Sequence, residues 1–289
     1  MKTLLFTVGL AIILGLGAIW LHATPVPQIS STASKAPDKT HVAFLPAVMS
    51  PTVGTPSATP ATIVVNTPTV VTVTVAITPT PISNGVNLLR LGATGTQPTI
   101  LGVMYDDGKN GDAVAGDGVY TLQVPFNEPT AGQIQVQVSA AFQGRLQRVL
   151  SGVLSLQVWN VAETQTGSGL PSAIPYPPTW TASPSSNNAS DGLYLSAASE
   201  EEAGQGISVV SLNAPLASIL LDPNDVLIAQ SSQTINGRQW LFVVEQEPQS
   251  GLQFYHAFLQ TSSGVVVIGG NDSPSNEGIV NSIILLLNP

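Results

Sequence analysis

The sequence predicts a two-domain, mostly β protein in which a β-sandwich precedes an α+β domain, behind an N-terminal hydrophobic targeting helix. Short β-rich runs separated by turn residues fill residues 62–159, and residues 170–289 combine further such runs with a helical pattern at the end. Only 9% of the 289 residues are charged, which favours short strands and turns over long charged helices.

Residues 1–23 form the expected targeting segment. They read MKTLLFTVGLAIILGLGAIWLHA, in which Lys2 precedes an uncharged apolar run from Leu4 to Leu21. This run is longer than the core of most cleaved signal peptides and close to the about 20 residues that span a bilayer. A cleaved signal peptide and an uncleaved signal anchor both stay open, and either one exports the remainder of the chain.

Residues 24–61 are expected to be a spacer, because they are rich in Pro, Ser and Thr. Such a composition buries too little apolar surface to offset the entropy of ordering the chain. Within it, the run HVAFLPAVM at residues 41–49 is apolar enough to add an edge strand. The polar run NVAETQTGSG at residues 160–169 is expected to link the two domains.

The first domain shows the alternation of a sheet with one wet face. In 71–75 and 134–138, Val and Ile alternate with Thr or Gln, so the apolar side chains share one face. In the second domain, residues 214–230 predict a helix broken at Pro223. The apolar positions from Ile279 to Leu287 predict a closing helix that packs on a sheet.

Two stretches of the first domain carry a family resemblance. They are LGVMYDDGKNGDAVAGDGVYTLQV at residues 101–124 and QVSAAFQGRLQRVLS at residues 137–151. Together they resemble the immunoglobulin-like domain of bacterial surface proteins of the choice-of-anchor X type. The resemblance covers about a third of the chain and implies an immunoglobulin-like β-sandwich on an exported protein.

The second domain is similar to the PsbP-like superfamily. The similarity lies in IPYPPTW at residues 174–180, TINGRQWLFV at residues 234–243, the run FYHAFLQTSSGVVVIGG, and the final helix ending in SIILLL. It implies an α/β/α sandwich around an antiparallel sheet, and a module that serves binding or assembly rather than catalysis. No cofactor residue is carried over.

The most polar window of the chain is YDDGKNGDAVAGDGVY, at residues 105–120. Carboxylate and amide oxygens are hard ligands suited to calcium. The candidate ligands are Asp106, Asp107, Asn110, Asp112 and Asp117. The spacing departs from an EF-hand loop, because Gly108 falls at its third position and Asp117 at its twelfth. A metal-free turn is the alternative, with Asp and Asn bonding their own backbone while glycines adopt positive φ.

Composition excludes several classes of function. The net charge is −9, which opposes binding to nucleic-acid phosphates. There is no cysteine, so disulfides, thiolate metal sites and a cysteine nucleophile are excluded. No GxSxG elbow, GxxxxGK[ST] loop or GxGxxG turn occurs in the sequence.

Glu245 and Glu247 are the basis of an enzymatic alternative. Two apart on a predicted strand, they would point to one face about 7 Å apart, a separation seen in inverting glycosidases. A solvated strand face is the preferred interpretation of the pair, because such enzymes draw their two carboxylates from separate elements across a cleft. His256 is the one histidine in a predicted folded region and is expected to be a half-buried strand residue.

The sequence therefore predicts an exported, non-enzymatic bacterial protein of the cell envelope or surface, which is extracellular or periplasmic. It would bind a protein or an envelope component through its C-terminal domain and touch the membrane only through an uncleaved N-terminal segment. A calcium-stiffened structural stalk is one alternative, and a glycan hydrolase that uses Glu245 or Glu247 is the other.

Overall fold

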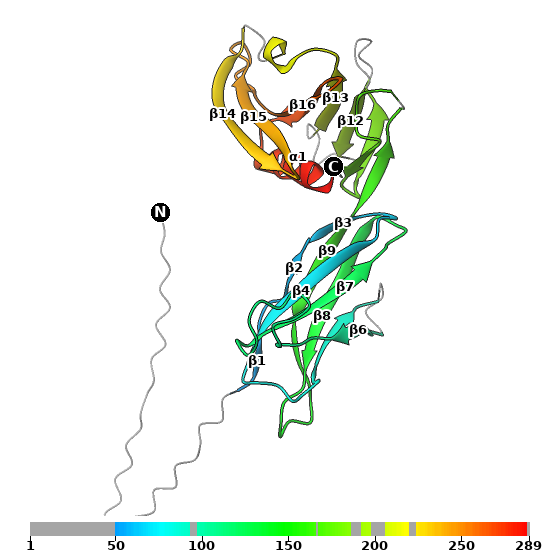
Figure 1. The fold of residues 1–289 in the computed structure, drawn as a ribbon, viewed down its shortest axis with the longest axis vertical. Helices are drawn as coiled ribbons and strands as arrows, with labels where there is room; N and C mark the ends of the chain where they lie inside the picture. Colours follow the sequence, from blue (N-terminus) through cyan, green and yellow to red (C-terminus); the bar gives the residue numbers. More distant parts are fainter. Residues whose placement is uncertain are drawn as a thin grey trace, which may run out of the picture. The chain divides into compact units, whose positions relative to one another are not determined.

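The computed structural model describes residues 50–92, 97–165, 167–185, 192–197, 206–219 and 224–287 (Figure 1). These residues belong to one compact unit, Met49–Pro289. The expected targeting segment, residues 24–49 of the spacer and the run at residues 41–49 lie outside the described residues. Among the helices of the described part, none is long and apolar enough to cross a bilayer. The fold is mostly β.

Two sheets build the first module. One contains β1 (Thr52–Val53), β2 (Ser57–Thr59), β4 (Thr69–Thr78) and β7 (Val119–Phe126). The other contains β3 (Thr62–Val64), β5 (Val86–Arg90), β6 (Thr99–Val103), β8 (Gly132–Ala140), β9 (Val149–Glu163) and β10 (Ala173–Tyr176). All pairings within them are antiparallel except that of β3 with β9, which is parallel.

The core of this module lies between the apolar faces of the two sheets. Val71, Val73 and Val75 of β4 are buried, whereas the threonines between them are partly exposed. Val136 and Val138 of β8 enter the same core from the other sheet. The alternation predicted from the sequence is confirmed at these positions, and the arrangement is compatible with a β-sandwich.

The end of the predicted spacer is part of a sheet. Thr52–Val53 and Ser57–Thr59 both pair with β4, so the ordered module begins before residue 62. The composition of this stretch was misleading because Pro and Ser are tolerated in and between short edge strands. Only the few residues that pair with β4 need an extended backbone.

The first four of the ten residues of the predicted linker, 160–169, are also in a strand. β9 runs for 15 residues, and its Asn160–Glu163 end pairs with β10. Pairing with an available partner strand has overridden the polar composition of this stretch. Trp159 on β9 is buried in the core of the second module, together with Ile174 and Trp240.

The second module is an antiparallel sheet with the strand order β11-β12-β13-β17-β16-β15-β14. Its strands are β11 (Trp180–Pro184), β12 (Gly192–Ala197), β13 (Gly206–Leu212), β14 (Val226–Ile235), β15 (Arg238–Gln246), β16 (Gln253–Thr261) and β17 (Gly264–Asn271). The sheet curves around helix α1 (Pro274–Leu286), which is red in Figure 1. Ser273 caps this helix by accepting a hydrogen bond from Asn276 N. Val280, Ile283 and Ile284 of the helix are buried in the same core as Trp240.

The helix predicted at residues 214–230 is wrong. A 3-10 turn, η2 (Leu216–Ser218), is followed by β14 from Val226 onward. Periodicity cannot separate a short apolar run such as Val226–Ile228 from a helical turn, and its pairing with β15 settles it as a strand. Helices on both faces of the sheet, as an α/β/α sandwich requires, are not found in the described residues. There, α1 covers one face, and Leu216 and Ile219 pack on the other.

Candidate functional site

The Asp/Gly loop connects β6 to β7 and is anchored at its base by the bridge between Tyr105 and Thr121. Its glycines adopt the positive φ values expected of them, at Gly108, Gly111, Gly116 and Gly118. Asn110 also has a positive φ, of 51°. The loop therefore folds tightly enough to bring residues that are distant in sequence together.

Backbone amides hold two of its aspartates in place. The carboxylate of Asp106 accepts from Gly116 N at 2.6 Å, Asp117 N at 3.2 Å and Gly118 N at 2.9 Å. Asp112 is buried, and its Oδ2 accepts from Gly108 N at 2.6 Å. The Asx turns that the metal-free interpretation predicts are found at Asp107 and Asp117, whose carboxylates accept from Lys109 N and Val119 N, two residues further along the chain.

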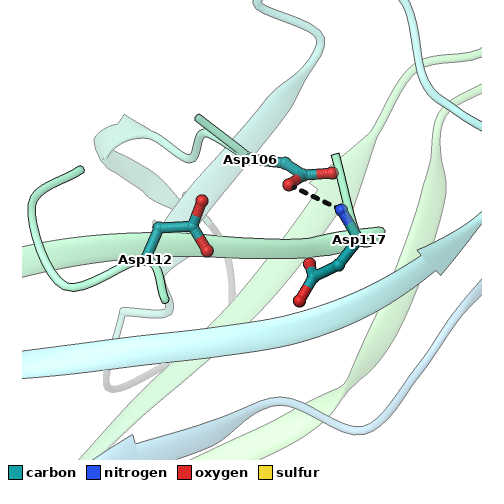
Figure 2. A group of neighbouring side chains, drawn as sticks. All are labelled: Asp106, Asp112 and Asp117. Atoms are coloured by element: carbon teal, nitrogen blue, oxygen red, sulfur yellow. Dashed lines mark hydrogen bonds between the residues drawn. The ribbon is translucent and has the colours of Figure 1, made fainter. Parts of the chain in front are cut away.

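Three carboxylates nevertheless converge. Figure 2 shows Asp106, Asp112 and Asp117 directed toward one another, and one oxygen from each lies within 4.8 Å of the others. Asp107, also expected as a ligand, is outside this group of acidic residues and accepts from Lys109 N at 3.1 Å. Asn110 contributes a turn conformation, and the structure assigns it no further role.

The donor set of Asp106, Asp112 and Asp117 fits a calcium ion. All three supply hard oxygens, and a carboxylate has about four acceptor positions, of which the hydrogen bonds described within the loop use at most three. Three like charges this close repel each other unless a cation offsets them. The pKa of Tyr120 is raised by burial first and then by the charge of Asp106, so the negative potential extends to the neighbouring strand.

Glu245 and His256 form a second polar site, on the sheet of the second module. The distance from His256 Nδ1 to Glu245 Oε1 is 3.0 Å. The imidazole stacks on Phe254 and meets Phe258 edge-on, and it lies over Gly269 of β17. Burial lowers the pKa of His256 despite the nearby carboxylate. We therefore describe the contact as a neutral Nδ1–H that donates to Glu245 rather than as an ion pair.

Glu247 lies just beyond the end of the strand that carries Glu245. β15 ends at Gln246, and Glu247 lies in the following turn, where its Oε2 accepts from the Ser250 hydroxyl at 2.5 Å. Pro248 explains the early end, because it has no N–H for a strand ladder. Neither glutamate lines the cleft around Arg238 or the groove between β14 and α1.

Two cavities involve residues that the sequence did not single out. A cleft of about 1,110 Å³ is lined by both modules, among others by Ile63, Thr67, Pro171, Arg238 and Leu286. A groove of about 530 Å³ lies between β14 and α1 and includes Ser231, Tyr255 and Asn281. Their linings come from segments far apart in the chain. Arg238 is the one basic residue among residues 170–289, and this was the only feature of the sequence that pointed toward the cleft.

Comparison of the chain with models of known protein families finds no match, and comparison with curated proteins finds none either.

Proposed function

We propose that this chain is an exported, non-enzymatic bacterial envelope or surface protein that acts as a binding or assembly module. The observation that carries the proposal is the cleft of about 1,110 Å³, which residues of both modules line. Binding sites are typically concave, largely apolar and supplied with a few placed polar groups. The N-terminal segment at residues 1–23 supports export, and the resemblance of residues 101–124 to surface-protein domains supports the location.

The chemistry of the lining suggests what the cleft binds. Leu170, Leu285 and Leu286 supply apolar surface. Thr67 supplies a hydroxyl, and Arg238 is the one charged residue of the lining. A guanidinium on an otherwise neutral surface selects a carboxylate or phosphate on its partner. The partner is thus a protein or envelope component that presents an acidic group beside apolar surface.

The test is capture of the partner from the native envelope by the full chain. Arg238→Ala removes the cation from the cleft and should weaken capture at least about tenfold, because charge-assisted hydrogen bonds are among the strongest. Arg145→Ala removes an exposed charge in the first module and is the matched control. Equal capture by the wild type and both variants would reject the cleft as the binding site.

A calcium-stiffened stalk is the second candidate function. Three converging carboxylates favour it, because an ion held by Asp106, Asp112 and Asp117 would cross-link the loop that joins β6 to β7. When bound, calcium would supply charge neutralisation and rigidity, with no chemistry on a substrate.

For the finer fold classes, we propose an immunoglobulin-like topology for the first module and a PsbP-like origin for the second. Two sheets around one core support the former. An antiparallel sheet with a C-terminal helix packed on one face supports the latter. An experimental structure of the full chain tests both topologies.

A further inference from the structure

β14 is the outer strand of the seven-stranded sheet, and within the described part of the chain no strand pairs with its outer side. Every residue from Val226 to Thr234 is exposed. Its ladder with β15 is regular from Ala229 to Ile235, after an irregularity between Leu227 and Ala229. A strand of this length presents a row of backbone donors and acceptors that another strand can use.

The turn that follows β14 determines which backbone groups face outward. Asn236 and Gly237 both have positive φ and form a two-residue hairpin turn closed by Ile235 and Arg238. The closing pair of such a hairpin exchanges both hydrogen bonds, and the pairs then alternate along the ladder. The N–H and C=O groups of Gln230, Ser232 and Thr234 therefore point to the open side.

The usual protection of an outer strand is largely missing from β14. Natural outer strands carry charges or Pro that prevent pairing with another chain. The sequence VLIAQSSQTI at residues 226–235 has neither, although the whole chain carries a net charge of −9. The one protective feature is the irregularity near Ile228, and it leaves the seven residues from Ala229 to Ile235 available.

That segment is complementary to itself. A two-fold axis normal to the sheet, beside Ser232 and midway between the two strands, would place Ser232 opposite Ser232 of the second copy. It would also place Ser231 opposite Gln233, Gln230 opposite Thr234 and Ala229 opposite Ile235. Each facing pair is then polar with polar or apolar with apolar, with no like charges opposed.

The directions of the backbone N–H and C=O groups of β14 are those that this register requires. The outward groups of Gln230, Ser232 and Thr234 fall in the hydrogen-bonded pairs of the dimer, so about six bonds would form between the copies. We propose that two copies of this chain associate through antiparallel pairing of β14 with β14, centred on Ser232, to make one continuous sheet. A self-pairing strand is an isologous contact, which closes a dimer rather than starting a fibre.

Cross-linking tests the register directly, because the chain has no cysteine of its own. Ser232→Cys should form a disulfide-linked dimer under mild oxidation, since Cα atoms of a hydrogen-bonded pair lie about 5.5 Å apart, within disulfide range. Gln230→Cys alone and Thr234→Cys alone should not form this disulfide. In this register the same position in the two copies is offset by four residues along the strand, or about 14 Å. A mixture of the Gln230→Cys and Thr234→Cys chains should cross-link.

Sedimentation of the full chain in a mild detergent measures the association itself. Ser232→Lys opposes two ammonium groups at the axis and should raise the dimer dissociation constant at least about tenfold. Gln239→Lys adds the same charge on β15, opposite Thr234, and should change the dimer dissociation constant less than about twofold.

Three outcomes would overturn the proposal. The first is a chain of monomer mass at all accessible concentrations. The second is Ser232→Cys cross-linking no better than Gln230→Cys alone, which would indicate random collision or an unrelated strand as the occupant. The third is an equal loss of association in Ser232→Lys and Gln239→Lys.

Discussion

Nδ1 of His256 lies 3.0 Å from Oε1 of Glu245 on the neighbouring strand, in a site where burial lowers the pKa of the imidazole. In the unfolded chain this histidine titrates near its ordinary value of 6.5. Just below pH 6.5 the unfolded state therefore binds more protons than the folded state. The contribution of His256 to stability is fully present above that pH and decreases as the pH falls toward the lowered folded pKa.

We expect the free energy of unfolding to fall between pH 7.5 and pH 5.5 in the wild type, and to fall less in His256→Gln. Urea unfolding at the two pH values measures this difference. Glutamine keeps an N–H that can donate to Glu245 but does not titrate. An identical pH dependence in the two proteins would refute the assignment of a buried, neutral imidazole.

Gly269 makes room for that imidazole. A methyl group added at residue 269 would collide with His256 and lie 2.7 Å from the carbonyl oxygen of Tyr255. Gly269→Ala should therefore destabilise the protein by about 1–3 kcal/mol, the usual range for overpacking. Gly152→Ala on β9, where an added Cβ meets nothing within 4 Å, is the control and should change stability little. Denaturant midpoints compare the two, and equal values would contradict the close contact.

Arg90 and Glu128 form a two-pronged ion pair, with N–O distances of 2.7 and 2.8 Å. The hydrogen bond from Arg90 lowers the pKa of Glu128, so this stabilisation is present above pH 4.5 and is lost as the pH falls through the folded pKa. The Arg90 side chain is 38% exposed, which screens the interaction. We expect Arg90→Lys to cost up to about 1 kcal/mol at pH 7. The cost should decrease as the pH falls below 4.5, and a cost that does not change with pH would point to packing instead.

The metal hypothesis predicts a calcium-dependent melting temperature for the full chain. Calcium at a hundredfold excess over its dissociation constant would add about 2.7 kcal/mol, or a shift of about 5 °C or more. Asp112→Asn should abolish the shift. Asp107→Asn alters an exposed residue of the same loop outside the converging group and should preserve it. If melting is the same with calcium and with chelator, the loop is a turn held by its own amides.

Local patterns were sufficient to predict the face of β4, the closing helix and the glycine conformations of the Asp/Gly loop. The carboxylate of Asp117, and not that of Asp107, converges with that of Asp106. This depends on the path of the loop in space, which the spacing of the residues in the sequence does not determine. The strand at residues 226–235 was mistaken for a helix, because its partner β15 supplies the distinguishing contacts. The cleft around Arg238 was unpredictable, since its walls are formed by segments more than a hundred residues apart.

β9 bears on how the chain would carry mechanical load. Its first part pairs with β8 and β3, its last residues pair with β10, and Trp159 between them is buried beside Trp240. Tension applied along β9 would act parallel to these ladders, so that many hydrogen bonds share the force and must shear together. A chain built in this way would yield by rupture of a sheet, at high force, rather than by extension of a slack tether between its modules.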